Sequence, residues 1–267
     1  MSVKISELPV LAPEDVAAGD VVAIVDSSEG VTKQVELAGV LAGGVASGFR
    51  NAIINGNFGQ NQRGVSGTVT LAAGAYGHDR WKAGASGCTY TFATVENVTT
   101  LTITAGSLVQ VIEGANLFTG TYVLSFTGTA QGKIGAGSFG ASGITGSVTG
   151  GTNLTIEFNT GTVAQVQLEA GSVATPFERR PVGTELALCQ RYFSVHTFVL
   201  ASVSFGGSGG ALNQISYPVR MRTTPALSLT VPSGTGGTVT SEGERLLRQN
   251  TLHSAIVAST VTADSEL

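Results

Sequence analysis

The sequence predicts an all-β protein with a small N-terminal segment, a central β-sandwich of the jelly-roll kind, a smaller C-terminal β-domain and one short helix between the two domains. Three observations predict this class. Gly occupies 37 of the 267 positions, only 12% of the residues are charged, and short runs of alternating apolar residues recur between glycine-rich turns. Because 42% of the residues are hydrophobic, the chain is able to bury a substantial core.

Changes in composition along the chain divide it into three parts. Residues 1–44 form the N-terminal segment, 45–183 the sandwich, and 184–267 the linker helix and C-terminal β-domain. The stretch GGVASG at 43–48 separates the first two parts, since glycine and small residues leave the backbone free and bury little surface.

In the sandwich, alternating apolar residues favour strands with one buried face. Tyr90 and Phe92 fall on one face of an extended chain, and so do Leu154, Ile156 and Phe158. The expected strands are Thr89–Val95, Val98–Thr104, Ser107–Glu113, Thr121–Thr127, Asn153–Phe158 and Val163–Glu169. In the glycine-rich stretch 128–151, short strands are expected at Lys133–Gly135 and Gly143–Val148.

After the sandwich, TELALCQR at 184–191 predicts a two-turn helix with Thr184 as its N-cap. The strands expected beyond it are Tyr192–Phe205, Leu212–Arg220, Ala226–Val231, Gly237–Ser241 and Ser254–Thr262.

Charge and apolar patterning exclude several classes of function. The formal net charge is −4 and cations are sparse, which removes the electrostatic basis for binding nucleic acid. No apolar run is long enough to insert into a membrane, and the N-terminus lacks the pattern of a secretory signal, so we expect synthesis in the cytoplasm. Cys88 and Cys189 lack metal-binding spacing and are expected to be buried free thiols, with a bridge between subunits as the alternative.

Catalytic motifs are also missing from the sequence. Acidic residues occur singly, with no DxE or ExD pair of the kind that would suggest glycoside hydrolysis. His78, His196 and His253 stand apart from any nucleophile motif, and no metal-binding pattern or bound cofactor is indicated. We therefore expect a protein that is not an enzyme.

The N-terminal segment resembles the attachment segment of tailed-bacteriophage fibre and appendage proteins. The match is carried by ISELP at 5–9, VVAIVD at 21–26 and GVTKQVELAGVL at 30–41, which predict two short strands and a small helix. The resemblance implies virion anchoring by Ile5, Leu8, Pro9, Val22, Ile24, Val25, Asp26, Val31, Val35, Leu37 and Leu41. The alternative to virion anchoring is that the segment is an N-terminal arm on an ordinary globular protein.

Residues 49–193 resemble a module of phage tail-fibre and appendage proteins that is similar to carbohydrate-binding jelly rolls. An opening stretch (FRNAIINGNFGQNQRG, 49–64), a central one (HDRW, 78–81) and a closing one (VQLEAGSVATPFERRPVGTELALCQRYF, 166–193) carry this match. The later stretch YPVRMRTTP at 217–225 resembles the β-domain that follows in similar proteins.

Within the module, the candidate glycan contacts are Arg63, Tyr76 and Trp81, because rings stack on sugars and Arg binds hydroxyls. As the only tryptophan, Trp81 is better suited to filling the sandwich core than to stacking on a sugar, and we regard the core as its default role. Asp79 and Arg80 are expected to brace the motif. Glu169 is expected to pair with Arg179 or Arg180 or, as a minor alternative, to bind calcium with Asn57.

These resemblances imply a structural component of a tailed-phage virion, either a tail fibre or a short appendage that adsorbs to a host surface glycan. The alternatives are an architectural collar, neck or baseplate protein without a ligand, and a free lectin-like protein. The expected partners are other virion proteins of the tail, baseplate or neck, and further copies of the chain. A homotrimer is the first choice, since neighbouring copies would cover exposed strand edges.

Overall fold

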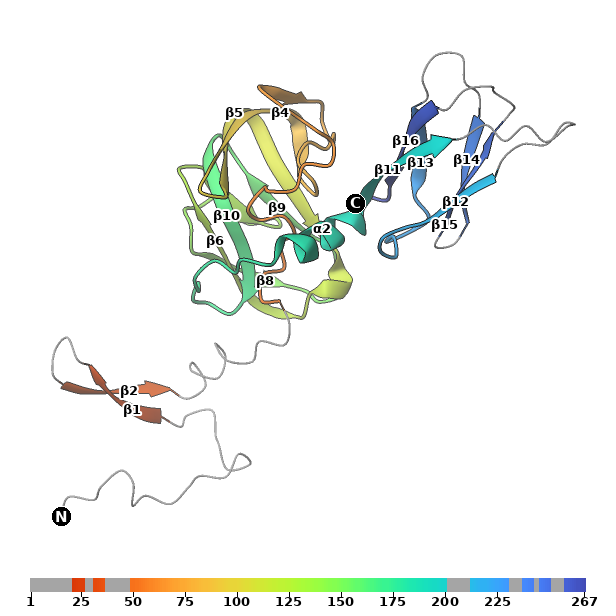
Figure 1. The fold of residues 1–267 in the computed structure, drawn as a ribbon. Coiled ribbons are helices and arrows are strands. Elements are labelled where there is room, and N and C mark those ends of the chain that lie inside the picture. The colour runs from red at the N-terminus through yellow and green to blue at the C-terminus, as the bar shows by residue number, and fades with distance from the viewer. Residues whose placement is uncertain are drawn as a thin grey trace, which may run out of the picture. The chain divides into compact units, whose positions relative to one another are not determined.

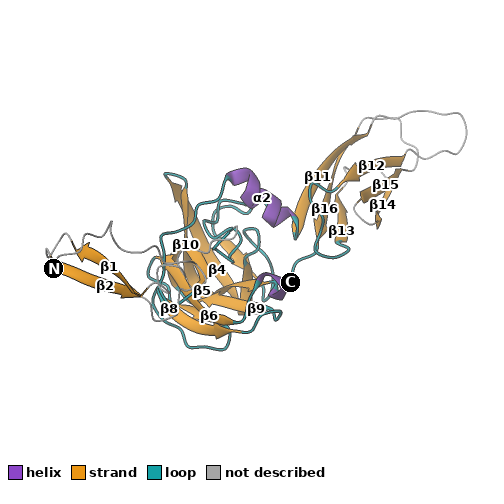
Figure 2. Cartoon of the chain, turned by 90° about the horizontal axis from the view of Figure 1, so that it is seen from below, coloured by secondary structure: helices purple, strands orange, loops and turns teal. Residues whose placement is uncertain are grey.

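A computed structural model of the chain describes residues 21–26, 31–36, 49–200, 212–230, 237–242, 245–250 and 257–267. The described elements are mostly strands, which confirms the predicted all-β class. Figure 2 shows how little of the described chain is helical. The chain divides into two compact units, Met1–Arg50 and Asn51–Leu267, so the first boundary follows the predicted hinge.

In the N-terminal unit the described residues form an antiparallel pair of strands, β1 (Val21–Asp26) and β2 (Val31–Glu36). The first of them coincides with the predicted VVAIVD strand. Val22, Ile24, Val25 and Asp26 therefore lie on β1, and Val31 and Val35 lie on β2. The predicted helix and the anchoring candidates Ile5, Leu8, Pro9, Leu37 and Leu41 lie outside the described residues.

The second unit begins with an eight-stranded sheet, seen in Figure 1 around β4, β5 and β10. Its path runs β3-β4-β5-β10-β6-β8, while β9 pairs with both β5 and β7. The strands are β3 (Val69–Leu71), β4 (Lys82–Val95), β5 (Val98–Ile112), β6 (Gly120–Thr127), β7 (Gly132–Ile134), β8 (Ile144–Val148), β9 (Leu154–Phe158) and β10 (Gly161–Ala170). Each expected strand of the sandwich is present, whereas β3 was not predicted.

Two expected strands, Val98–Thr104 and Ser107–Glu113, form the single strand β5 instead. The prediction placed a turn at the glycine between them. Gly106 does adopt a left-handed φ of 71°, but it lies at an irregularity in the pairing with β4, which resumes beyond it. A bulge absorbs the glycine without ending the strand.

Strand β10 joins the two halves of the sheet. Its residues Gly161–Val163 pair with β5, and from Ala164 onward it pairs with β6, with a register shift at the change. Gln165 lies at this shift with a left-handed φ of 50°. The main core cluster draws side chains from both halves, with β4 and β5 contributing Tyr90 and Leu101 and β6 contributing Leu124.

The single α-helix of the described chain, α2, spans Val182–Gln190. The predicted helix is confirmed, but it begins two residues earlier than expected. Pro181 is at the N-cap position with extended backbone angles, so the assignment of Thr184 as N-cap was wrong. Proline favours a helix start because its fixed φ suits the first turn and its missing N–H is not needed there.

The remaining described strands form two three-stranded sheets, β11-β16-β13 and β12-β15-β14. Their bounds are β11 (Phe193–Leu200), β12 (Leu212–Ser216), β13 (Ala226–Thr230), β14 (Gly237–Glu242), β15 (Arg245–Asn250) and β16 (Val257–Asp264). Five of the six overlap predicted strands, and β15 was missed. Tyr217, Met221, Val261 and Ala263 form a small core here.

Candidate functional site

The opening stretch of the module lies against β10 and is held there by one asparagine. The Asn51 side chain donates to the Val166 carbonyl oxygen (3.0 Å) and accepts from the Leu168 amide (3.1 Å). Backbone bonds Ala52 N to Leu168 O and Val166 N to Gly56 O, both 2.8 Å, flank these contacts. The segment is thereby bonded to β10 much as a neighbouring strand would be.

Asn55 joins the opening stretch to the central HDRW stretch. Its side-chain amide donates to the carbonyl oxygens of Gln60 (2.9 Å) and Asp79 (3.0 Å), while its backbone carbonyl oxygen accepts from the Trp81 indole (3.0 Å). The left-handed φ of 57° at this position is one that Asn tolerates better than most residues. At the next residue, a Cβ on Gly56 would clash with the Val166 carbonyl oxygen.

The closing stretch completes the arrangement through two charged side chains. The buried Arg180 donates to the carbonyl oxygens of Ile53 (3.0 Å) and Asn51 and pairs with Glu185 (3.2 Å). Glu185 in turn accepts the Asn55 amide. We call this set the interlock: Asn51, Asn55, Asp79, Trp81, Arg180 and Glu185.

Glu169 and Asn57, the calcium candidates, each have a protein partner, although the side-chain oxygen of Asn57 is buried without a hydrogen-bond partner. Both carboxylate oxygens of Glu169 accept hydrogen bonds from Thr175, through its amide (2.8 Å) and its hydroxyl (2.7 Å). Asn57 instead donates to the Asn97 carbonyl oxygen (2.7 Å). Glu169 therefore orders the turn after β10, while Arg180 pairs with Glu185 and Arg179 donates to the Asn97 carbonyl oxygen.

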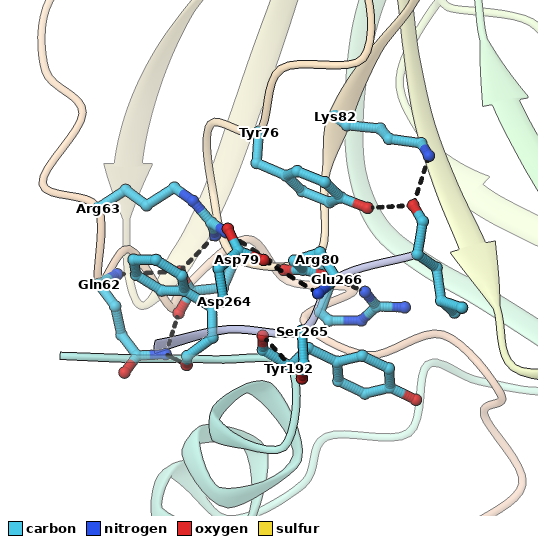
Figure 3. A network of polar contacts seen from close by, with 12 residues as sticks. Gln62, Arg63, Tyr76, Asp79, Arg80, Lys82, Tyr192, Asp264, Ser265 and Glu266 are labelled. Atoms are coloured by element: carbon cyan, nitrogen blue, oxygen red, sulfur yellow. Dashed lines mark hydrogen bonds and ion pairs between the residues drawn. The ribbon is translucent and has the colours of Figure 1, made fainter. Parts of the chain in front are cut away.

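A second polar network lies where the segment Ser265–Leu267 meets the residues around the HDRW stretch (Figure 3). We call these residues the cradle: Gln62, Arg63, Tyr76, Arg80 and Lys82. Tyr76 and Lys82 face each other across an isolated β-bridge, and Arg80 has a left-handed φ of 70°. The chain reversal at 76–82 thus gathers cationic and aromatic groups.

Arg63 is enclosed by rings and carboxylates. Its guanidinium carbon lies 3.7 Å from the Phe193 ring centroid and 5.0 Å from that of Tyr76. Its nitrogens lie 3.6 Å from Asp79 and 3.5 Å from both Asp264 and Glu266. The side chain keeps only 13% of its exposure, so these interactions operate away from bulk water.

Arg80 is buried more deeply. It forms an ion pair with Glu266, donates to the Val111 carbonyl oxygen (2.6 Å) and lies 3.6 Å from the Tyr192 ring centroid. The expectation that Asp79 and Arg80 brace the motif is confirmed, since Asp79 also accepts the Gln62 backbone amide (3.1 Å).

Burial dominates the electrostatics of the network. It raises the pKa of the Glu266 carboxyl above its ordinary value, although Arg80 and Arg63 act in the opposite direction. Burial likewise raises the pKa of Asp79, and that of Tyr76 to about 12, while it lowers the pKa of Lys82. Most of these charges are buried opposite a charge of the other sign, although Arg63 Nη1 and Arg80 Nε lack a hydrogen-bond acceptor and Asp264 keeps 44% of its exposure. Paired charges of this kind suit holding two chain segments together.

Of the three candidate glycan contacts, Arg63 and Tyr76 lie together in the cradle. Trp81 instead belongs to the core. Trp81 is fully buried, with ring centroids 4.9 Å from Phe58 and 6.0 Å from Phe158. Its assignment as a sugar-stacking residue is therefore wrong, and its default role in the core is confirmed.

Sequence reasoning missed Lys82, Ser265, Glu266 and Leu267. The signal available was an acidic DSEL end to the last strand and a cluster of cations near HDRW. Patterns among neighbouring residues do not predict that two such stretches, nearly 200 residues apart, lie in contact. Cys88 and Cys189 are free and buried, as predicted.

Comparisons with known proteins give no relative: no family model matches the chain, and neither a curated protein nor a solved structure is significantly similar to it. Among the described residues, no group of three or more His, Cys, Asp or Glu side chains is placed to hold a metal ion. None of the helices in the described ranges has the length and apolar character needed to cross a bilayer.

Proposed function

We propose that this chain is a structural component of a tailed-phage virion, attached through its N-terminal segment. The central eight-stranded region serves as a jelly-roll scaffold, and the two small sheets after α2 form a distal module. The chemical task is to present a rigid shape, with no bond making or breaking.

The observation that carries the proposal is the interlock. The three stretches that resemble the phage module are far apart in sequence, yet in each of them a side chain donates to a backbone carbonyl oxygen of another. Asn55 and Trp81 are almost fully buried, and their side chains bond to backbone partners. The buried carboxylate of Asp79 accepts from Gln62 and lies near Arg63. Residue types shared with the module therefore serve its framework, which supports a shared architecture.

The cradle favours the architectural form of the proposal over glycan adsorption at this place. Arg63 and Tyr76 were the remaining candidate glycan contacts, and both are engaged by the segment Ser265–Leu267 and its neighbours. A sugar would have to displace this segment. We therefore place the chain among collar, neck, baseplate or short-fibre parts, assembled as a homotrimer beside other virion proteins.

A deletion experiment tests the proposal. The phage that encodes the chain is propagated with a tagged copy of either the full chain or residues 45–267, and purified particles are probed by immunogold labelling and mass spectrometry. We expect the full chain in particles and the shortened one only in the soluble fraction. Equal melting curves for the two proteins show that the shortened chain is folded.

Two outcomes would contradict the proposal. Equal entry of the shortened chain into particles would remove the anchoring role, and absence of the full chain from particles would remove the virion assignment. A glycan array separates the remaining alternatives. A glycan-adsorbing virion protein or a free lectin would bind glycans on the array, whereas an architectural virion protein is expected to give no signal.

A further inference from the structure

The segment Ser265–Leu267 is held through its backbone although it lies beyond the last strand. The Ser265 amide donates to the Tyr192 carbonyl oxygen at 2.7 Å. Arg222 donates from Nε to the Ser265 carbonyl oxygen (2.7 Å) and from its terminal nitrogen to that of Glu266 (2.9 Å). Such contacts recognise an extended backbone independently of its side chains.

The carbonyl oxygen of Leu267 is the meeting point of two further donors. The Tyr76 hydroxyl and the Lys82 ammonium both donate to it, each at 2.6 Å. Figure 3 shows both side chains pointing at this one oxygen from the chain reversal that they flank. One donor is charged, so the contact is stronger than a neutral hydrogen bond.

Glu266 supplies the charge that the cradle recognises. Its carboxylate lies between Arg63 and Arg80, and its side chain keeps only 4% of its exposure. Each arginine is itself stacked on a ring, that of Phe193 or Tyr192. Stacking fixes the orientation of each guanidinium, which lowers the entropy lost when the carboxylate binds.

Leu267 adds an apolar anchor. Its side chain packs against the small cluster of Ile54, Cys189 and Tyr192, together with Leu188 of α2. Backbone, charge and apolar recognition thus converge on three consecutive residues. That combination is how folded domains bind short peptides with specificity.

We propose that the cradle, with Arg222 and the Leu267 cluster, is a peptide-recognition site for an extended acidic-then-apolar sequence, filled by the chain's own Ser265–Leu267. The site is separable from its ligand, because every recognised group lies within three residues that follow β16. The same short sequence supplied on a separate molecule fits the same contacts.

The test uses a chain shortened to residues 1–264 and a fluorescent peptide that ends in Asp-Ser-Glu-Leu. We expect the shortened chain to bind the peptide, measured by fluorescence anisotropy. The full chain is expected to bind at least about tenfold more weakly, because its own segment competes. Changing the peptide's Glu to Gln should weaken binding by at least about tenfold, since the buried Arg80 then loses its counter-charge and Arg63 loses one of three nearby carboxylates.

Matched variants locate the site. In the shortened chain, Arg63→Lys is expected to weaken binding, because Lys lacks the planar group that stacks between rings. Lys133→Ala, which removes an ion pair with Glu157 elsewhere, is expected to leave it unchanged. Equal effects of the two variants, or equal binding of the Glu and Gln peptides, would overturn the proposal.

A second protein covers the case in which the shortened chain does not fold. The full chain with Glu266→Ala and Leu267→Ala keeps its backbone but loses both side-chain anchors, and added peptide should raise its melting temperature. No shift with the native peptide, or the same shift with the Gln peptide, would overturn the proposal.

Discussion

Buried charged and polar residues join distant segments of this protein. Arg80 and Asp79 are almost fully buried, yet each has partners that satisfy its charge or its hydrogen bonds. A buried charge left without a partner costs several kcal/mol, on the order of 3–5. Such residues therefore tolerate substitution poorly whether or not a ligand binds near them.

His78 should make stability depend on pH. Burial lowers its pKa to about 4 from 6.5, and the ring lies against Phe92 and Tyr90. When the pKa of a histidine is lower in the folded state than in the unfolded state, the protein keeps its full stability above the unfolded-state pKa. It loses stability as the pH falls from the unfolded-state pKa toward the folded-state pKa. From pH 7 to pH 5 we expect the titration of His78 to lower the free energy of unfolding by about 2 kcal/mol.

The measurement is urea unfolding at both pH values, for the wild type and for His78→Gln. The carboxyls of Asp79 and Glu266 have raised pKa values, so they act in the opposite direction, but they are present in both proteins. The variant should lose less stability between pH 7 and pH 5 than the wild type does. An identical loss would contradict the assignment to His78.

Asn51 should be far less replaceable than an exposed asparagine. Replacing it by Ala removes the donor to Val166 and the acceptor for Leu168, leaving buried backbone groups unpaired. We expect a loss of about 2–4 kcal/mol in the free energy of unfolding. Asn116→Ala, at an exposed position, should change it by less than about 0.5 kcal/mol. Similar losses would contradict the interlock.

Among the elements, strands were predictable where apolar residues alternate and one face is buried. β9 and β6 follow this rule, and their bounds lie close to the expected ones. β15 (RLLRQN) was missed because its residues favour helix, and its pairing with β12 and β14 overrides that local preference. β5 was divided at a glycine because sequence alone does not distinguish a bulge from a turn.

Gly106→Ala should test the bulge that keeps β5 continuous. An added Cβ would clash with the Gly87 carbonyl oxygen, and the left-handed φ of 71° disfavours any other residue. We expect a loss of at least about 2 kcal/mol in chemical denaturation. Gly120→Ala in β6 is the control, since nothing lies within 4 Å of its added Cβ. A harmless Gly106→Ala would refute this role.

The start of α2 gives a further prediction. Thr184 lies inside the helix, so Thr184→Ala should alter stability by less than about 0.5 kcal/mol, where an N-cap would cost about 1 kcal/mol. Glu185→Gln should cost about 2 kcal/mol, because it removes the counter-charge of Arg180. Thermal unfolding compares the two variants, and the reverse order of effects would contradict the helix start at Val182.

At the scale of the whole molecule, the chain separates into the units 1–50 and 51–267. The main core cluster lies entirely within the second unit. Deleting residues 1–50 should therefore leave its calorimetric melting temperature within about 2 °C of that of the full chain. A drop of about 10 °C or more would mean that the N-terminal unit contributes to the same cooperative core.

The sequence by itself determined the strand-rich class, the helix near 184–191 and the burial of both cysteines, and it placed a boundary near residue 45, a few residues before the division between Arg50 and Asn51. Each depends on local composition or on the period of apolar residues, which neighbouring positions define. Only the tertiary structure decided that Asn51 bonds to β10 and that Glu266 lies between Arg63 and Arg80. These contacts join residues more than 70 positions apart, and their energy comes from excluding water, which no local pattern records.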